Sequence, residues 1–225
     1  MPLDLQLIGT GIYAPREAAR LAGVHSRDVL RWTRGGKHVQ PLWRAYYQQL
    51  ENSCDLSFRD MLEIRVVASL RRAGVSMQAI RFAIQFAERS FGLERPLSSQ
   101  RFRTDGQEIL IEALEDTSQL TSLSPKRPGQ MVFKSVVEQS LKDLEYDGDD
   151  PIRWRPHRHP AVVIDPARAF GDPILNRSGI STSFLRSDMA QGNSVNRLAR
   201  LYEIDPQEVR SALAFEQALD GQRTL

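Results

Sequence analysis

The chain has 225 residues, of which 41% are hydrophobic and 26% are charged, and its formal net charge is +2. This balance is typical of one or two compact globular domains and excludes a disordered or fibrous chain. No stretch approaches the about 20 consecutive apolar residues of a membrane span, and the N-terminus lacks a signal-peptide pattern, so we expect a cytoplasmic protein. Cys54 is the only cysteine, which excludes an intrachain disulfide.

Charge is distributed unevenly along the chain. Residues 1–95 hold 14 Lys/Arg and 9 Asp/Glu (+5), residues 96–150 hold 6 and 11 (−5), and residues 151–225 hold 10 and 8 (+2). Basic ends are typical of surfaces that face phosphates, whereas an acidic middle indicates a different partner. The alternative is a fluctuation of surface charge that has no function.

Two short helices are predicted first. Residues 14–22 form one helix, and residues 27–34 form the next, with Ser26 as its N-cap and Gly23 opening the turn between them. The second helix has arginines on one face and apolar residues on another, so it can bury one side and offer cations to DNA on the other. The arginines are Arg27, Arg31 and Arg34, and the apolar residues are Val29 and Trp32.

The following residues predict a wing and a helix pair. Residues 37–56 are polar with scattered aromatic residues, and we expect a β-hairpin wing that carries Lys37 and Arg44. A capping sequence at Ser57 starts a helix that runs to about Ala73. The helix over 77–90 is apolar on two sides, which favours a central core position or a subunit interface.

The middle of the chain predicts a small α/β or β-rich layer. Residues 92–104 have the composition of a linker. We expect strands over 108–114 and 130–133, a helix over 134–144, an acidic turn over 146–151, and short paired strands over 153–155 and 162–164.

The last part predicts three helices, over 182–191, over 194–202 and from Pro206 to about Leu219, with Asp205 as N-cap of the third.

A helix-turn-helix spacing occurs near each end of the chain: a small residue is followed at +4 by a turn residue and at +5, +10 and +13 by packing positions. The two sets are Ala19, Gly23, Val24, Val29, Trp32 and Ala199, Glu203, Ile204, Val209, Ala212.

The first 90 residues resemble the MerR-type winged helix-turn-helix. The matching segments are Tyr13–Ala19, Leu21–Val24, Val29–Trp32 and Leu70–Ser76, together with Ile80. The chain departs from that family at Trp32-Thr33, where two aromatic residues are usual, in its longer wing, and in lacking sustained heptads after residue 91.

The last 55 residues resemble a second family, small antitoxin-like domains of uncharacterised function that are often encoded beside nuclease toxins. The matching residues are Gly171–Ile174, Ile180, Gly192, Ser194, Val195, Leu198, Ala199, Tyr202, Ile204, Glu208, Val209, Ala212 and Leu213. Where the family has Gly-Thr-Arg-Ile, this chain has Arg177-Ser178-Gly179-Ile180.

Together the two ends resemble VapB-type antitoxins. The resemblance implies a mainly α protein with three parts: a winged helix-turn-helix domain over 1–95, a small α/β layer over 96–160 and a three-helix helix-turn-helix domain over 161–225. It further implies a homodimer that binds operator DNA, represses its own operon and neutralises a PIN-domain ribonuclease. The alternative is a MerR-like, ligand-responsive regulator, and no catalytic constellation supports an enzyme.

Candidate contacts follow from these readings. For DNA they are Ser26, Arg27, Arg31, Arg34, Lys37 and Arg44, of which Arg27 is placed for base edges and the other basic residues for phosphates. A second candidate DNA set is Asn196, Arg197, Arg200, Gln207 and Arg210, and candidate toxin contacts are Arg153, Arg155 and Arg158. The histidines at 157 and 159 lie two apart, but neighbouring arginines disfavour a metal, so we expect neither a metal nor a cofactor.

Overall fold

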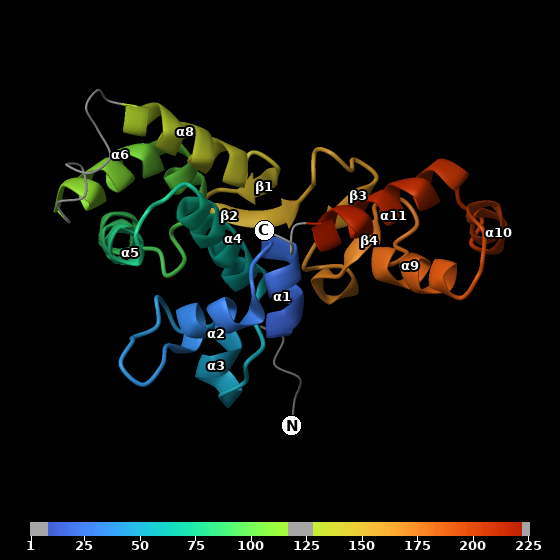
Figure 1. Cartoon of the computed structure of the whole chain (residues 1–225), viewed down its shortest axis with the longest axis horizontal. Coiled ribbons are helices and arrows are strands. Elements are labelled where there is room, and N and C mark those ends of the chain that lie inside the picture. Colours follow the sequence, from blue (N-terminus) through green and yellow to red (C-terminus); the bar gives the residue numbers. More distant parts are fainter. Residues whose placement is uncertain (1–8, 117–127, 222–225) are drawn as a thin grey trace.

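The computed structural model describes residues 9–116 and 128–221, and it is mainly helical with one small antiparallel sheet (Figure 1). The helices are α1 (Pro15–Ala22), α2 (Ser26–Arg34), α3 (Tyr46–Glu51), α4 (Phe58–Arg72), α5 (Met77–Phe91), α6 (Gln100–Asp116), α8 (Pro128–Leu141), α9 (Thr182–Ala190), α10 (Val195–Leu201) and α11 (Pro206–Gly221). The strands are β1 (Leu144–Asp147), β2 (Asp150–Trp154), β3 (Val162–Ile164) and β4 (Pro173–Leu175). Within the described residues, none of the helices is both long and apolar enough to cross a membrane.

The repeated spacing is built as a repeated helix corner. In each copy the residue at +4 takes a left-handed conformation, Gly23 at φ 66° and Glu203 at φ 53°. In each, the amide at +5 donates a 3.0 Å hydrogen bond to the carbonyl of the first residue, which satisfies a free carbonyl at the helix end. The positions at +10 and +13 are buried in both copies: Val29, Trp32, Val209 and Ala212.

The same corner also joins α4 to α5. Gly74 has φ 87°, the Val75 amide donates to the Leu70 carbonyl at 3.1 Å, and Ile80 and Ala83 are fully buried. The spacing therefore encodes how two helices meet at a turn, whether the second helix faces solvent or the core.

The four strands form one antiparallel sheet in the order β1-β2-β3-β4. The predicted pairing of 153–155 with 162–164 is confirmed by the partners Trp154 and Ile164, and the predicted acidic turn lies between β1 and β2 around Gly148. One hydrophobic core runs through this sheet from Tyr13 to Leu219, and a smaller core fills the corner made by α9, α10 and α11.

The predicted β-hairpin over 37–56 is wrong. The described chain has a single Gly36–Val39 bridge at the start of this segment, Leu56 at its end pairs with Tyr13 instead of with the segment itself, and α3 occupies residues that we assigned to the wing. The cause is Asp60, a fully buried carboxylate that accepts hydrogen bonds from Trp43 Nε1 and the Tyr46 amide, both at 2.9 Å. These bonds hold the 43–46 segment against α4 instead of leaving it free to pair as a strand.

The predicted linker over 92–104 and the predicted strands over 108–114 and 130–133 are also wrong. Residues 95–99 are buried, α6 begins at Gln100, and the two apolar runs lie inside α6 and α8. Phe102, Ile109 and Leu110 have helical spacing and are buried where α6 contacts α5 and α8. The predicted helix over 134–144 is confirmed in part, since α8 spans 128–141.

An ion-pair cluster joins the two ends of the chain. Glu216 of α11 is 1% exposed and receives Arg20 of α1 at 2.6 Å, Arg186 of α9 at 3.5 Å and the Thr182 hydroxyl at 2.5 Å. Arg20 and Arg186 also pair with Asp220, at 3.1 and 2.7 Å. Figure 1 shows the end of α11 reaching α1 at the centre of the molecule. The C-terminal helices are therefore docked on the first helix corner.

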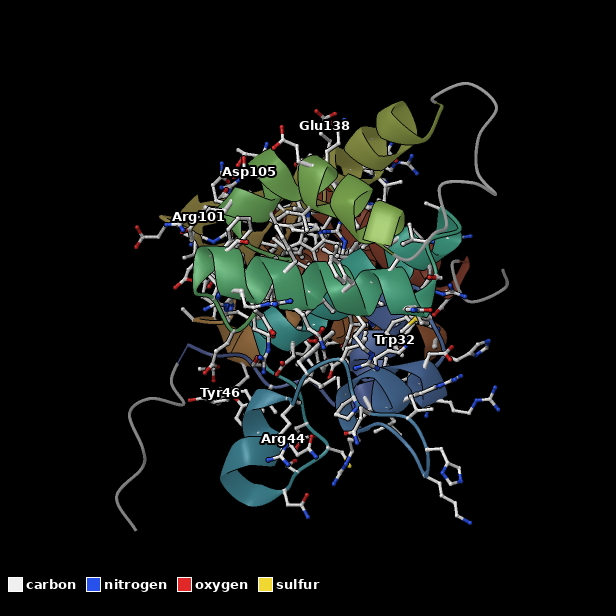
Figure 2. All side chains as sticks on the ribbon, turned by 90° about the vertical axis from the view of Figure 1, so that its left-hand side faces the viewer. Trp32, Arg44, Tyr46, Arg101, Asp105 and Glu138 are labelled. Atoms are coloured by element: carbon white, nitrogen blue, oxygen red, sulfur yellow. The ribbon has the colours of Figure 1, made fainter. Side chains whose placement is uncertain are left out.

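The apolar helix α5 packs against α4 and α6 at the face of the molecule turned toward the viewer in Figure 2, and not at the central core position that was one of its two predicted places. Its Ala79, Ile80, Ala83, Ile84 and Ala87 are buried in the core. On the second apolar side Phe82 and Phe86 stack with ring centroids 6.3 Å apart and are half-buried. One apolar side of α5 is thus covered within this chain, and the subunit interface predicted for the other side stays a prediction.

Candidate nucleic-acid interface

The second helix presents two arginines to solvent. Arg27 and Arg31 are exposed on α2, while Val29, Trp32 and Thr33 on its other face are buried. The Thr33 hydroxyl donates to the Val29 carbonyl at 2.9 Å, which satisfies this polar group inside the core. Figure 2 shows Trp32 turned inward beneath α5. The predicted division of α2 into a packing face and a cationic face is confirmed.

Ser26 does not cap α2, contrary to the prediction. The N-cap is His25, which makes no side-chain capping bond, and Ser26 is the first helical residue, with an exposed side chain. An unused Ser26 hydroxyl at the start of α2 is still free to meet a phosphate or a base edge, because helix N-termini attract anions.

Arg34 differs from the other two arginines of α2. Its guanidinium donates to Asn52 Oδ1 at 2.9 Å and to Cys54 Sγ at 2.5 Å, and the residue is half-buried. These bonds tie the end of α2 to the segment after α3. Arg34 thus has a positioning role in the free protein, which the sequence did not indicate because its partners lie 18 and 20 residues away.

A tight turn follows α2 and carries Lys37 and His38, both exposed. Gly35 makes this turn possible: it has φ 76°, and a Cβ there would lie 2.3 Å from the Val39 carbonyl oxygen. Arg81 of α5 holds the far side of the turn by donating to the Pro41 carbonyl at 2.6 Å and the Gln40 carbonyl at 2.7 Å. Lys37 therefore lies beside α2 in a turn that the single Gly36–Val39 bridge closes.

Arg44 is positioned by a buried charge network. The exposed Arg44 side chain lies toward α3 in Figure 2, near Tyr46. Its backbone carbonyl accepts a hydrogen bond from Arg95, and Arg95 Nε pairs with Asp60 at 2.7 Å. Asp60 also accepts from the backbone and hydroxyl of Ser57, at 3.1 and 2.8 Å, in the predicted capping box. Sequence reasoning identified the cap but missed Arg95.

The second candidate DNA set is exposed on one end of the molecule. Asn196, Arg197 and Arg200 lie on α10, and Gln207 and Arg210 lie on α11, where they bond to each other at 2.9 Å. The acidic Glu203 occupies the left-handed turn position between these helices and is exposed. This corner therefore exposes both signs of charge. On α2 of the first corner the exposed charged side chains, Arg27 and Arg31, are basic, while the acidic Asp28 between them is half-buried.

The candidate toxin-binding arginines fall into two groups. Arg153 pairs with Asp165 at 2.9 Å and with Glu145 at 3.1 Å, and Arg155 pairs with Glu145. Arg158 is exposed and makes no ion pair with the described residues. His157 Nδ1 meets Asp143 Oδ2 at 2.9 Å, but no group of three or more potential metal ligands forms within the described residues.

The chain is similar to a family of domains, to a named protein and to a solved structure. Residues 162–215, from β3 into α11, match a family model described as a protein of unknown function (DUF433). Over 221 residues the chain is 28% identical to a Mycobacterium tuberculosis protein named "Putative antitoxin VapB45", with coverage of 90% of this chain and 92% of the relative. The chain is a homologue of that protein. A crystal structure of Rv2018 from Mycobacterium tuberculosis has the same fold, with a TM-score of 0.71 and 27% identity over 95% of this chain and 99% of that one.

Proposed function

We propose that the chain is the DNA-binding antitoxin of a toxin–antitoxin pair, and that α1 and α2 form its DNA-reading unit. The observation that carries the proposal is the exposed pair Arg27 and Arg31 on a helix whose opposite face is buried. An α-helix with this division can enter the major groove while its buried side stays packed on the domain. Similarity to a named antitoxin over nearly the whole chain supports the same reading.

Each cationic residue has a proposed role. Arg27, near the start of α2, contacts base edges together with Ser26, whereas Arg31, Lys37 and Arg44 contact phosphates. Arg34 keeps its bonds to Asn52 and Cys54 and sets the angle of the turn that carries Lys37. As a DNA-binding surface we rank α10 and α11 below α2, because Glu203 and Glu208 lie between their cationic residues and would repel phosphates.

Partners follow from the same proposal. A homodimer would set two α2 helices into successive major grooves, about 34 Å apart. The toxin is a PIN-domain ribonuclease, and repression of the shared operon follows from operator binding. Among the candidate toxin contacts we favour Arg158, because Arg153 and Arg155 are already paired with Glu145.

The toxin proposal is tested with the product of the adjacent gene. We expect the two proteins to co-purify and the chain to suppress RNA cleavage by its partner. Replacing Arg158 with Ala should weaken the complex, while Arg89→Ala, which removes another exposed arginine, should leave it unchanged. A neighbouring gene product that neither binds the chain nor cleaves RNA would contradict the proposal.

A further inference from the structure

A cavity of about 700 Å3 opens where the two ends of the chain meet the middle. Its walls come from the end of α1, from α4 and α8, from the segment after β2 and from α11. In Figure 1 these elements converge at the centre of the molecule, beside the C-terminal end of α11. The volume lies in the range of pockets that hold small molecules.

The cavity is lined by three arginines that have no carboxylate partner among the described residues. Arg65 instead donates to the Ser140 carbonyl at 2.6 Å and lies over the Trp154 ring at 4.3 Å from its centroid. Arg72 reaches the Ala22 carbonyl at 3.5 Å, and Arg158 is exposed at the rim. Arg20 and Arg95, by contrast, pair with the buried carboxylates Glu216 and Asp60.

Other charges near the cavity do not cancel this group. Asp143 is the only acidic residue in the lining. Its charge favours protonated Arg65 without a direct ion pair, and its carboxylate accepts from the backbone of His157 at 3.3 Å and meets the His157 ring at 2.9 Å. Burial lowers the pKa of the Arg65 guanidinium to about 10, so it stays protonated at neutral pH. Lys142 Nζ lies 3.3 Å from His157 Nε2 and adds a further positive charge beside the rim.

Apolar and aromatic side chains also line the cavity, beginning with Trp154 beneath Arg65. Trp154 is 5% exposed, and its Nε1 has no hydrogen-bond partner among the described residues. Phe215 and Leu219 of α11 and Leu21 of α1 continue this lining. His159 meets the Phe215 ring edge-on at 5.5 Å, and burial lowers its pKa, which keeps the ring neutral near pH 7. The site thus combines unpaired cations with a hydrophobic surface.

We propose that this cavity binds a small organic anion, with its phosphate or carboxylate on Arg65 and Arg72 and its apolar body against Trp154 and Phe215. Guanidinium groups hold such anions by charge-assisted bonds, and the aromatic wall adds apolar contact. A bound ligand would touch α1 and α11 together and so stabilise their contact. The inference does not rest on DNA or toxin binding, and Arg158 at the rim is the one residue that it shares with the proposed toxin contact.

Two probes test the two kinds of anionic group: adenosine monophosphate carries a phosphate, and benzoate carries a carboxylate. The chain contains three tryptophans, so incorporation of 5-fluorotryptophan gives one fluorine signal each for Trp32, Trp43 and Trp154. We expect at least one probe to move the Trp154 signal and to leave the other two in place. The variant Trp154→Phe is used only to assign that signal.

Adjacent arginines at the end of α4 supply a matched control. Arg72 lines the cavity, whereas Arg71 donates to the Val75 carbonyl at 2.7 Å and lies outside it. Arg72→Gln should weaken probe binding about tenfold, the loss expected for one charge-assisted bond, and Arg71→Gln should leave it unchanged. Equal melting temperatures for the two variants would confirm that both fold.

Three outcomes would overturn the proposal. One is that neither probe moves the Trp154 signal at millimolar concentration. Another is that the shift survives Arg72→Gln unchanged. The third is that only a protein partner moves the signal, because the cationic group would then receive an acidic side chain of that partner instead of a small anion.

Discussion

The contact between α11 and α1 depends on Glu216, so we predict that Glu216→Gln destabilises the whole chain. The carboxylate is 1% exposed and its partner Arg20 has a side chain that is 21% exposed, which places the pair largely out of water. Removing one member of a buried ion pair leaves the other charge without compensation and costs about 3 kcal/mol or more. For a chain of this size such a loss lowers the melting temperature by about 10 °C.

The two arginines that pair with Glu216 differ in solvent exposure, so their substitutions should differ in cost. Arg186 meets the same carboxylate at 3.5 Å, but its side chain is 48% exposed, so Arg186→Gln should cost no more than about 1 kcal/mol. Glu203→Gln is the matched control, because Glu203 is exposed on the same part of the chain. Urea unfolding followed by circular dichroism gives each free energy of unfolding. Two results would contradict this prediction: a free energy of unfolding for Glu216→Gln within about 1 kcal/mol of the control, or equal losses for Arg20→Gln and Arg186→Gln.

Two further predictions concern stability. Burial raises the pKa of Glu63 from 4.5 to about 7, against the lowering effect of its hydrogen bond from the Ser98 amide, so the folded state holds this proton more tightly than the unfolded chain. The stabilisation from this proton is full below about pH 4.5, and about 3 kcal/mol of it is lost as the pH rises through about 7. Glu63→Gln should therefore flatten the plot of the free energy of unfolding against pH over this range. Parallel plots for the variant and the unmodified chain would contradict this prediction. Gly35→Ala should lower the free energy of unfolding in urea by about 1–3 kcal/mol, because its Cβ would lie 2.3 Å from the Val39 carbonyl oxygen. The control Gly36→Ala, whose Cβ would meet nothing within 4 Å, should change it by no more than about 0.5 kcal/mol. Equal losses for the two variants would contradict the tight turn at Gly35.

Local signals in the sequence predicted the helix corners well. Gly23 in its left-handed turn, the capping box at Ser57 and Pro206 at the start of α11 all act through neighbours within a few residues. The helix-corner spacing nevertheless occurs a third time at Gly74, in a corner whose second helix, α5, packs against α6. Spacing alone therefore predicts the corner, and exposed cations such as Arg27 are needed before DNA contact is inferred.

Partners far apart in the sequence decided the parts that the sequence did not predict. Residues 95–99 have the composition of a linker, yet the Leu97 and Ser98 amides donate to Glu63, 34 and 35 residues earlier, at 3.3 and 2.7 Å. Arg65 and Arg72, which share a cavity with Arg158, carried no local signal of a site for the same reason. The run inside α6 differs, because Glu, Leu and Ala are strong helix formers and the strand prediction missed this local signal.

DNA binding by α2 is tested most directly by fluorescence anisotropy with the DNA upstream of the chain's own gene, at several salt concentrations. We predict that the double variant Arg27→Ala/Arg31→Ala loses this binding, and that any residual binding has a salt slope lower by about 2, because two phosphate or base contacts are gone. The charge-matched variant Arg89→Ala/Arg101→Ala removes two exposed arginines from α5 and α6 and should bind as the unmodified chain does. Unchanged affinity and salt slope in the α2 variant, with its fold intact by circular dichroism, would contradict the account.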